Sequence, residues 1–184
     1  MVIIVVVGMP GSGKEVFLQC ALAKGFGHVS MGEVVREFGT ENRLESTDRS
    51  IGEFATSERQ KHGDSVWAER TIERLPVGNA VIDGSHSIEE IDFFRKRLGK
   101  DIQVVAIRAS QELRFHRLKL RQRDDAPITL DDFIMRENRE MSWGIGRAIE
   151  SADITIENEG GLDEFQVRCQ AILNNILAMR RESI

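Results

Sequence analysis

The chain has 184 residues, of which 41% are hydrophobic and 30% charged. These values fit a folded protein with a buried core and exclude a disordered or low-complexity chain. The 25 basic and 30 acidic residues give a net charge of -5, so we expect no binding to nucleic acid or to an anionic membrane surface. The longest apolar run, residues 2–7, is too short to cross a bilayer. We therefore expect one cytoplasmic domain over residues 1–184, a monomer or homodimer that acts on a small molecule.

The two cysteines, Cys20 and Cys169, lie far apart inside apolar helical patterns. We expect both to be small buried hydrophobic residues rather than disulfide partners or metal ligands. The four histidines show no metal-ligand spacing, and only His86 lies beside other candidate functional residues.

Strand and helix patterns alternate along the chain. The predicted strands cover residues 3–7, 27–29, 79–83, 102–107 and 153–157. The predicted helices cover residues 14–24, 31–38, 48–62, 65–75, 88–98, 111 to about 122, 130 to about 142, and 162–181. Gly39 is expected to end the second of these helices, residues 31–38. Buried strands separated by helices predict an α/β fold with a parallel sheet that binds ligands at the carboxyl ends of its strands.

The strongest chemical signal is a glycine-rich loop between the first strand and the first helix. Residues 8–14 have the G-x-x-x-x-G-K pattern of a phosphate-binding loop. Backbone N–H groups of such a loop cradle phosphate oxygens, and the lysine reaches the terminal phosphates. We expect ATP to be held by Gly8, Pro10, Gly11, Ser12, Gly13 and Lys14.

Two acidic residues are candidate ligands for Mg²⁺. Glu15 stands where Ser or Thr supplies a hydroxyl to the metal in the full motif. Its carboxylate could bind Mg²⁺ or could repel the phosphates, and both possibilities stay open. Asp83 ends a buried strand, where an acidic residue can hold Mg²⁺ beside the phosphate loop. His86 follows closely and either contacts an acceptor phosphate or faces solvent.

Arginines gather on two consecutive predicted helices. Arg114 and Arg117 share a helix face with Arg121, and Arg123 follows just beyond. A further arginine, Arg136, lies on the next helix. We interpret Arg121, Arg123 and Arg136 as part of a lid that neutralises the phosphate being transferred, and expect Arg114 and Arg117 to face solvent.

These residues carry a family resemblance over nearly the whole chain. The sequence resembles the P-loop nucleoside monophosphate kinases, and is most similar to archaeal adenylate-kinase-related proteins that also resemble dephospho-CoA kinase. Ser30, Gly32 and Arg36 match the acceptor-nucleotide motif of that group, the run 81–84 resembles its strand ending in Asp-Gly, and residues 123–125 with Arg136 resemble its lid. The segment 152–161, which includes Asn158, is similar to the closing strand and loop beside the donor base.

The resemblance implies a three-layer P-loop fold with a five-stranded parallel sheet. It also implies an acceptor-binding insert at about 30–75 and a lid at about 114–140, with Asp83 and His86 on the acceptor side. The sequence departs from the group at Glu15, and it has Ser85, His86 and Ser87 where an arginine usually follows the Asp-Gly.

Three functions remain possible from the sequence. The first is an ATP-dependent kinase that transfers the γ-phosphate to a nucleoside monophosphate, with Lys14, Arg121, Arg123 and Arg136 as catalytic residues. The second is a dephospho-CoA kinase, whose hydroxyl acceptor needs a general base. The third is a nucleotide-binding switch or slow ATPase without transfer activity.

Overall fold

The computed structural model describes residues 1–45, 47–99, 102–120 and 129–182. Five strands form one sheet, in the order β2-β3-β1-β4-β5, and every neighbouring pair is parallel. The strands are β1 (Ile3–Val7), β2 (Gly27–Ser30), β3 (Ala80–Asp83), β4 (Gln103–Arg108) and β5 (Ile154–Glu157). The predicted α/β fold and its five-stranded parallel sheet are therefore confirmed.

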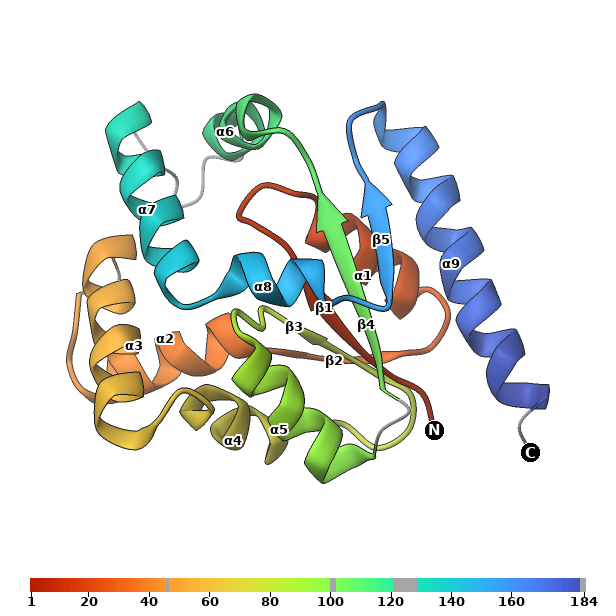
Figure 1. Ribbon diagram of the computed structural model, residues 1–184, viewed down its shortest axis with the longest axis horizontal. Coiled ribbons are helices and arrows are strands. Elements are labelled where there is room, and N and C mark those ends of the chain that lie inside the picture. The colour runs from red at the N-terminus through yellow and green to blue at the C-terminus, as the bar shows by residue number, and fades with distance from the viewer. Residues whose placement is uncertain (46, 100–101, 121–128, 183–184) are drawn as a thin grey trace.

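Nine helices lie within the described residues and connect or follow these strands (Figure 1). They are α1 (Lys14–Leu22), α2 (Met31–Glu41), α3 (Asp48–His62), α4 (Val66–Ile72), α5 (Ile88–Leu98), α6 (Gln111–Leu120), α7 (Leu130–Ser142), α8 (Ile145–Glu150) and α9 (Leu162–Glu182). Figure 1 shows α2, α3 and α4 gathered at the opposite side of the molecule from α9.

The sheet is covered on both faces, which explains why its central strands are uniformly apolar. All five residues of β1 are buried. Alternate residues of β1 contribute to two separate cores: Val5 packs in the core made with α2, α3, α4, α5 and α8, and Ile4 packs in the core made with α1 and α9. A strand with apolar neighbours on both sides needs no polar face, so a continuous Ile/Val run is the expected pattern.

The phosphate-binding loop follows β1, the strand at which the strand order of the sheet switches from one side to the other. Strand β1 pairs with β3 on one side and with β4 on the other, so that Val5 is in register with both Ile82 and Val104, and the chain passes from the β2–β3 side of β1 to the β4–β5 side. The loops after β1 and its two neighbours therefore diverge at the carboxyl edge of the sheet, which is where ligands bind in open α/β sheets.

Two predicted helix boundaries and one connection differ from the structure. Gly39 does not end its helix, because α2 continues to Glu41. Gly39 is buried, and a Cβ atom there would lie 2.7 Å from the Cδ1 atom of Ile51, so this glycine allows α2 and α3 to pack closely. Helix α4 is shorter than predicted, and α8 was missed because its six residues are too few to show a helical period.

The cysteines behave as predicted: Cys20 and Cys169 are both buried and free. In the part of the chain that the structure describes, no helix is both long and apolar enough to span a bilayer.

Two adjacent phenylalanines test the core assignment. Phe94 of α5 is fully buried, whereas its neighbour Phe93 is only partly buried at the margin of the same core. We expect Phe94→Ala to lower the free energy of unfolding by about 3–5 kcal/mol, because it leaves a cavity that the core cannot fill. Phe93→Ala is the matched control and should cost clearly less. Urea unfolding of both variants measures the difference, and equal losses would contradict the assignment.

Candidate active site

The loop between β1 and α1 is shaped as a phosphate cradle. Gly8, Gly11 and Gly13 all have positive φ angles, at 154°, 80° and 109°. Gly13 precedes the first residue of α1, and a Cβ atom at this position would lie 2.3 Å from the Asn158 side-chain nitrogen. Only glycine fits this turn, which lets backbone N–H groups and the N-terminus of α1 face a phosphate.

Lys14 is held over its own loop. Its Nζ atom donates hydrogen bonds to the carbonyl oxygens of Gly8, at 2.5 Å, and Met9, at 3.4 Å. The ammonium group is thus kept beside the cradle by two neutral oxygens, which a terminal phosphate can replace with stronger, charge-assisted bonds. This position agrees with the predicted ATP-binding role.

Asn158 joins the loop after β5 to the phosphate loop, and its place beside the donor base stays a prediction. Its Nδ2 atom donates to the carbonyl oxygen of Ser12 at 2.8 Å, and its backbone N–H donates to Arg108 at 2.8 Å. Asn158 is buried. It is therefore a brace between the ends of β4 and β5 and the cradle.

Arg114 and Arg117 do not face solvent as predicted. Arg114 is buried, and its Nη1 atom contacts Glu137 of α7 and the carbonyl oxygen of Pro10. Arg117 donates to the carbonyl oxygen of Asn158 at 3.0 Å. The prediction was wrong because helical periodicity shows which residues share a face, but not that this face of α6 lies across the phosphate loop.

Asp83 is the residue that best fits a metal ion. It ends β3 beside β1, in register with Val6, and its Oδ1 atom is buried without a hydrogen-bond partner. A buried carboxylate oxygen without a donor suits Mg²⁺ or a water molecule bound to it. Among the described residues no three His, Cys, Asp or Glu side chains converge on one point, so phosphate and water oxygens would have to complete the coordination shell.

The surroundings of Glu15 differ from those of Asp83. It is exposed on the first turn of α1, and its carboxylate accepts a hydrogen bond from Gln19 at 3.2 Å. An acidic residue in the first turn is favoured by the helix dipole, which accounts for Glu15 without a metal ion. Its metal-binding role stays a prediction.

A cavity opens between α2, α3 and the α7–α8 segment. Its empty volume is about 670 Å³ with open solvent included. Its apolar wall includes Val35, Ile51 and both tryptophans, and its four arginines come from three helices: Arg36, Arg59, Arg136 and Arg139.

The predicted acceptor motif lies at this cavity. Gly32 and Arg36 line it, and a Cβ atom at Gly32 would lie 3.5 Å from the Arg36 guanidinium. Arg36 makes no ion pair with any described residue and is exposed, so its charge is available to a ligand. Ser30 has another task, because its hydroxyl caps α2 by accepting from the Glu33 N–H at 3.3 Å.

The predicted lid residues are only partly described. Arg136 lines the cavity, and its Nε atom lies 3.3 Å from Asp48 and 3.5 Å from Glu140. Arg121 and Arg123 lie outside the described residues. Arg139 also lines the cavity and pairs with Asp48; its helical spacing from Arg136 was the available sequence signal.

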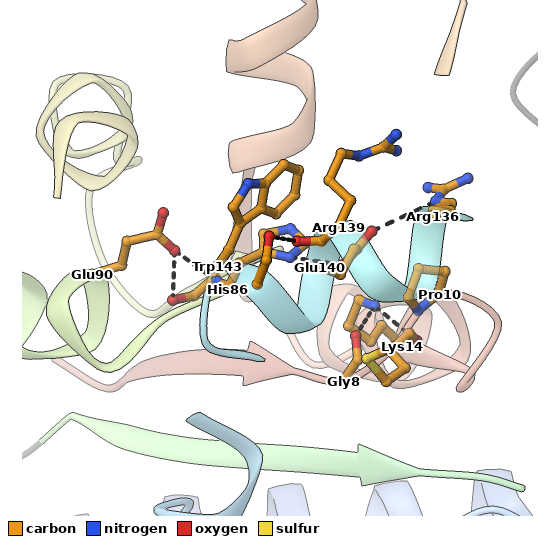
Figure 2. A network of polar contacts seen from close by, with 12 residues as sticks. Gly8, Pro10, Lys14, His86, Glu90, Arg136, Arg139, Glu140 and Trp143 are labelled. Carbon is orange, nitrogen blue, oxygen red and sulfur yellow. Dashed lines mark hydrogen bonds and ion pairs between the residues drawn. The ribbon is translucent and has the colours of Figure 1, made fainter. Parts of the chain in front are cut away.

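A buried carboxylate, Glu140, connects the cavity with the phosphate loop. Its Oε2 atom lies 2.8 Å from Nδ1 of His86, and its other oxygen faces Arg136 (Figure 2). Burial alone would raise the pKa of Glu140, but His86, Arg136 and Lys14 favour the carboxylate and lower its pKa to about 2. Glu140 is therefore a buried negative charge that lies against His86, which follows β3, and against Arg136 of its own helix.

His86 faces the cavity rather than solvent. Its ring packs edge-to-face on Trp143 with centroids 5.3 Å apart, and Figure 2 shows it pointing toward Glu140. Its backbone N–H donates to Glu90 at 2.6 Å. His86 is thus held through its ring by Glu140 and through its backbone by Glu90.

Arg59 and Glu90 were missed in the sequence analysis. Arg59 of α3 donates from Nη2 to Glu90 of α5 at 2.7 Å, and its guanidinium lies 4.5 Å from the centre of the Trp143 ring. Glu90 is completely buried and also accepts from Ser85. Charged residues within amphipathic helices normally face water, so no pattern in the sequence separates this pair from surface residues.

Comparisons with known proteins place the chain in a family. A family model described as an AAA domain matches residues 7–134. The UPF0200 protein of Thermoplasma acidophilum is 44% identical over 171 residues, which are 92% of this chain and 94% of the relative. The chain belongs to the UPF0200 family. Another UPF0200 protein, from Hyperthermus butylicus, is 36% identical over 177 residues, with 95% of this chain and 94% of the relative covered.

Solved structures show which fold this UPF0200 protein has. Shikimate kinase from Bacteroides thetaiotaomicron matches it with a TM-score of 0.65 at 17% identity, covering 94% of this chain and 98% of the kinase. A gluconokinase from Sinorhizobium meliloti matches with a TM-score of 0.55 at 17% identity, covering 97% of both chains. The fold is that of the P-loop kinases, and the predicted resemblance to P-loop kinases is confirmed.

The depressed pKa of Glu140 predicts a pH dependence of stability. Glu140 binds its proton near pH 4.5 when unfolded but near pH 2 when folded. The charged carboxylate therefore adds stability that is complete above about pH 5 and is lost as the pH falls toward 2. We expect Glu140→Gln to lower the free energy of unfolding at pH 7 and to reduce the further loss between pH 5 and pH 2.

Urea unfolding at a series of pH values measures this effect. Glu112→Gln is the control, because Glu112 is an exposed acid of α6. Parallel pH profiles for the wild-type protein and Glu140→Gln would contradict the assignment.

Proposed function

We propose that this protein is an ATP-dependent phosphotransferase that transfers the γ-phosphate of ATP to a nucleoside monophosphate. The observation that carries the proposal is the arginine-lined cavity that Glu140 links to the phosphate loop. Among the residues that the structure describes, four arginines line the cavity together with two acids, Asp48 and Glu140, and Glu90 lies behind Arg59. The excess positive charge suits a ligand with an anionic group, and the apolar wall suits a nucleobase.

In this proposal the two sites have separate tasks. The phosphate loop and Lys14 hold the phosphates of ATP, and Asn158 braces the loop. Arg36 and Gly32 contact the acceptor, and His86 lines its cavity. Arg136, together with Arg121 and Arg123 of the proposed lid at about 114–140, neutralises the transferred group. The insert at about 30–75 supplies the far wall of the cavity.

The reaction requires positioning rather than a nucleophile from the protein. An oxygen of the acceptor phosphate bonds to the γ-phosphorus while the bond from that phosphorus to the β–γ bridging oxygen breaks, and ADP leaves with the electron pair. At neutral pH the acceptor oxygen is already ionised, so no proton has to be removed. Mg²⁺, when bound, neutralises charge on the phosphate oxygens, and Asp83 is the residue placed to hold it.

Lys14 provides the first test. We expect Lys14→Ala to reduce acceptor-dependent ADP formation from Mg-ATP by about 100-fold or more, because the main cation on the terminal phosphates is lost. Lys96→Ala, an exposed lysine of α5, is the matched control. AMP, dAMP, CMP, UMP, GMP and dephospho-CoA are supplied in turn as acceptors.

The outcome separates the three functions. ADP formation that requires a monophosphate and disappears in Lys14→Ala supports the proposal and identifies the acceptor. Activity with dephospho-CoA alone would favour the alternative kinase. ATP binding without any acceptor-dependent turnover would contradict both kinases and favour a nucleotide-binding switch.

Asp83 provides a test of the metal site. We expect Asp83→Asn to raise the Mg²⁺ concentration for half-maximal turnover by about tenfold, because an amide oxygen is a weaker ligand than a carboxylate. Asp64→Asn, an exposed residue between α3 and α4, is the control. The assay is ADP formation over a range of Mg²⁺ concentrations, and an unchanged requirement would exclude Asp83 from the metal site.

A further inference from the structure

One carboxylate of α3 occupies the space between two arginines of α7. One oxygen of Asp48 lies 3.3 Å from Nε of Arg136, and the other accepts a hydrogen bond from Nη2 of Arg139 at 2.5 Å. All three residues line the cavity. The two guanidinium groups are about four-fifths buried, with 18% and 19% of their side chains exposed, against 30% for Asp48.

The place of Arg139 is prepared by a glycine in the middle of α3. A Cβ atom at Gly52 would lie 2.4 Å from Cζ of Arg139. Glycine inside a helix costs about 1 kcal/mol relative to alanine, so its position here is explained by the guanidinium that rests on it. On its other side Arg139 lies 5.8 Å from the centre of the Trp143 ring. The arginine is therefore held in position by packing, independently of Asp48.

We propose that Arg136 and Arg139 form an anion site for the phosphate monoester of the acceptor, and that Asp48 is the internal counter-ion which this phosphate displaces. The inference rests on the proposed function, and adds to it the place where the acceptor's own phosphate binds. It also makes Asp48 a specificity determinant, because an acceptor without a phosphate cannot take both arginines from a carboxylate.

The exchange is physically reasonable for both anions. A phosphate monoester offers three acceptor oxygens and up to two negative charges, so it makes stronger bonds to paired guanidinium groups than one carboxylate does. Asp48 is the first residue of α3, and Thr47, the residue before it, caps the helix. After release, its carboxylate remains favoured by the helix N-terminus and is near solvent. Glu140 stays beside Arg136 in either state, because it is buried and paired with His86.

The charge balance of the cavity supports the same conclusion. Arg136 and Arg139 face Asp48, Arg136 also faces Glu140, and Arg59 faces Glu90. Of these acids only Asp48 is substantially exposed, since Glu90 and Glu140 are buried. Asp48 is thus the anion that an entering phosphate can replace at the lowest cost in desolvation.

Intrinsic fluorescence can measure the exchange without turnover. The chain has two tryptophans and no tyrosine, and both tryptophans line this cavity. AMP, CMP, GMP and UMP, and the corresponding nucleosides, are titrated into the wild-type protein, Asp48→Asn and the control Asp64→Asn. We expect Asp48→Asn to bind the responding monophosphate about three- to tenfold more tightly, because the competing ion pair is gone. Binding of the nucleosides should not change.

A second variant tests the arginine side of the site. We expect Gly52→Ala to remain folded, because a helical alanine is favoured and the obstructed atom belongs to a flexible side chain. It should bind the monophosphate more weakly, because the new methyl group displaces the Arg139 guanidinium. Thermal unfolding of each variant confirms that changes in affinity are not changes in folding.

The possible results separate this inference from the proposed function. A wild-type protein that responds to no monophosphate would contradict both. A response with equal or weaker affinity in Asp48→Asn would overturn the counter-ion role alone and leave the kinase assay as the test of function. Tighter binding in Asp64→Asn as well would attribute the effect to net charge, and would also overturn it.

Discussion

Pairs between buried acids and basic side chains hold together the part of the molecule that contains the candidate site. Glu90 of α5 binds Arg59 of α3, and Glu140 of α7 binds His86 and Arg136. Each of these acids is buried. Leaving a buried charge without its partner costs several kcal/mol, by general estimates about 3–5. The Arg59–Glu90 and His86–Glu140 pairs each join two elements that are far apart in the sequence, whereas Arg136 and Glu140 both lie on α7.

A third pair, Arg114 with Glu137, joins α6 to α7 and at the same time contacts the phosphate loop through Pro10. This pair adds a contact at the phosphate cradle to the pairs that lie around the cavity. The pairs with Glu90 and Asp48 orient three of the arginines that line the cavity, Arg59, Arg136 and Arg139. Guanidinium groups that are already oriented lose little freedom when an anion arrives, which favours binding.

The sequence predicted the fold with good accuracy. The runs of Ile and Val and the glycine-rich loop are local signals, and the helices 48–62 and 88–98 have the predicted bounds. The errors have separate causes, and one of them shows how glycine misleads. Gly39 was expected to end a helix, but its absent side chain serves packing between α2 and α3, and a sequence pattern does not distinguish these two uses of glycine.

Some residues of the candidate site could be predicted from local sequence, and others depend on how the helices pack. The amino-acid sequence by itself determined the phosphate cradle, because strand, glycine turn and helix are consecutive in the chain and their geometry depends on local backbone preferences. Asp83 at the end of its strand and Arg36 in its motif belong to the same class.

Only the tertiary structure decided which charges meet. Arg59 and Glu90 are separated by 31 positions and Asp48 and Arg139 by 91. Whether such residues face water or each other depends on how α3, α5 and α7 pack around the sheet. Burial turns them from ordinary surface charges into fixed ion pairs, because a charge removed from water is stable only beside its partner. Local patterns carry no information about that packing, so the cavity and its counter-ions became visible only in three dimensions.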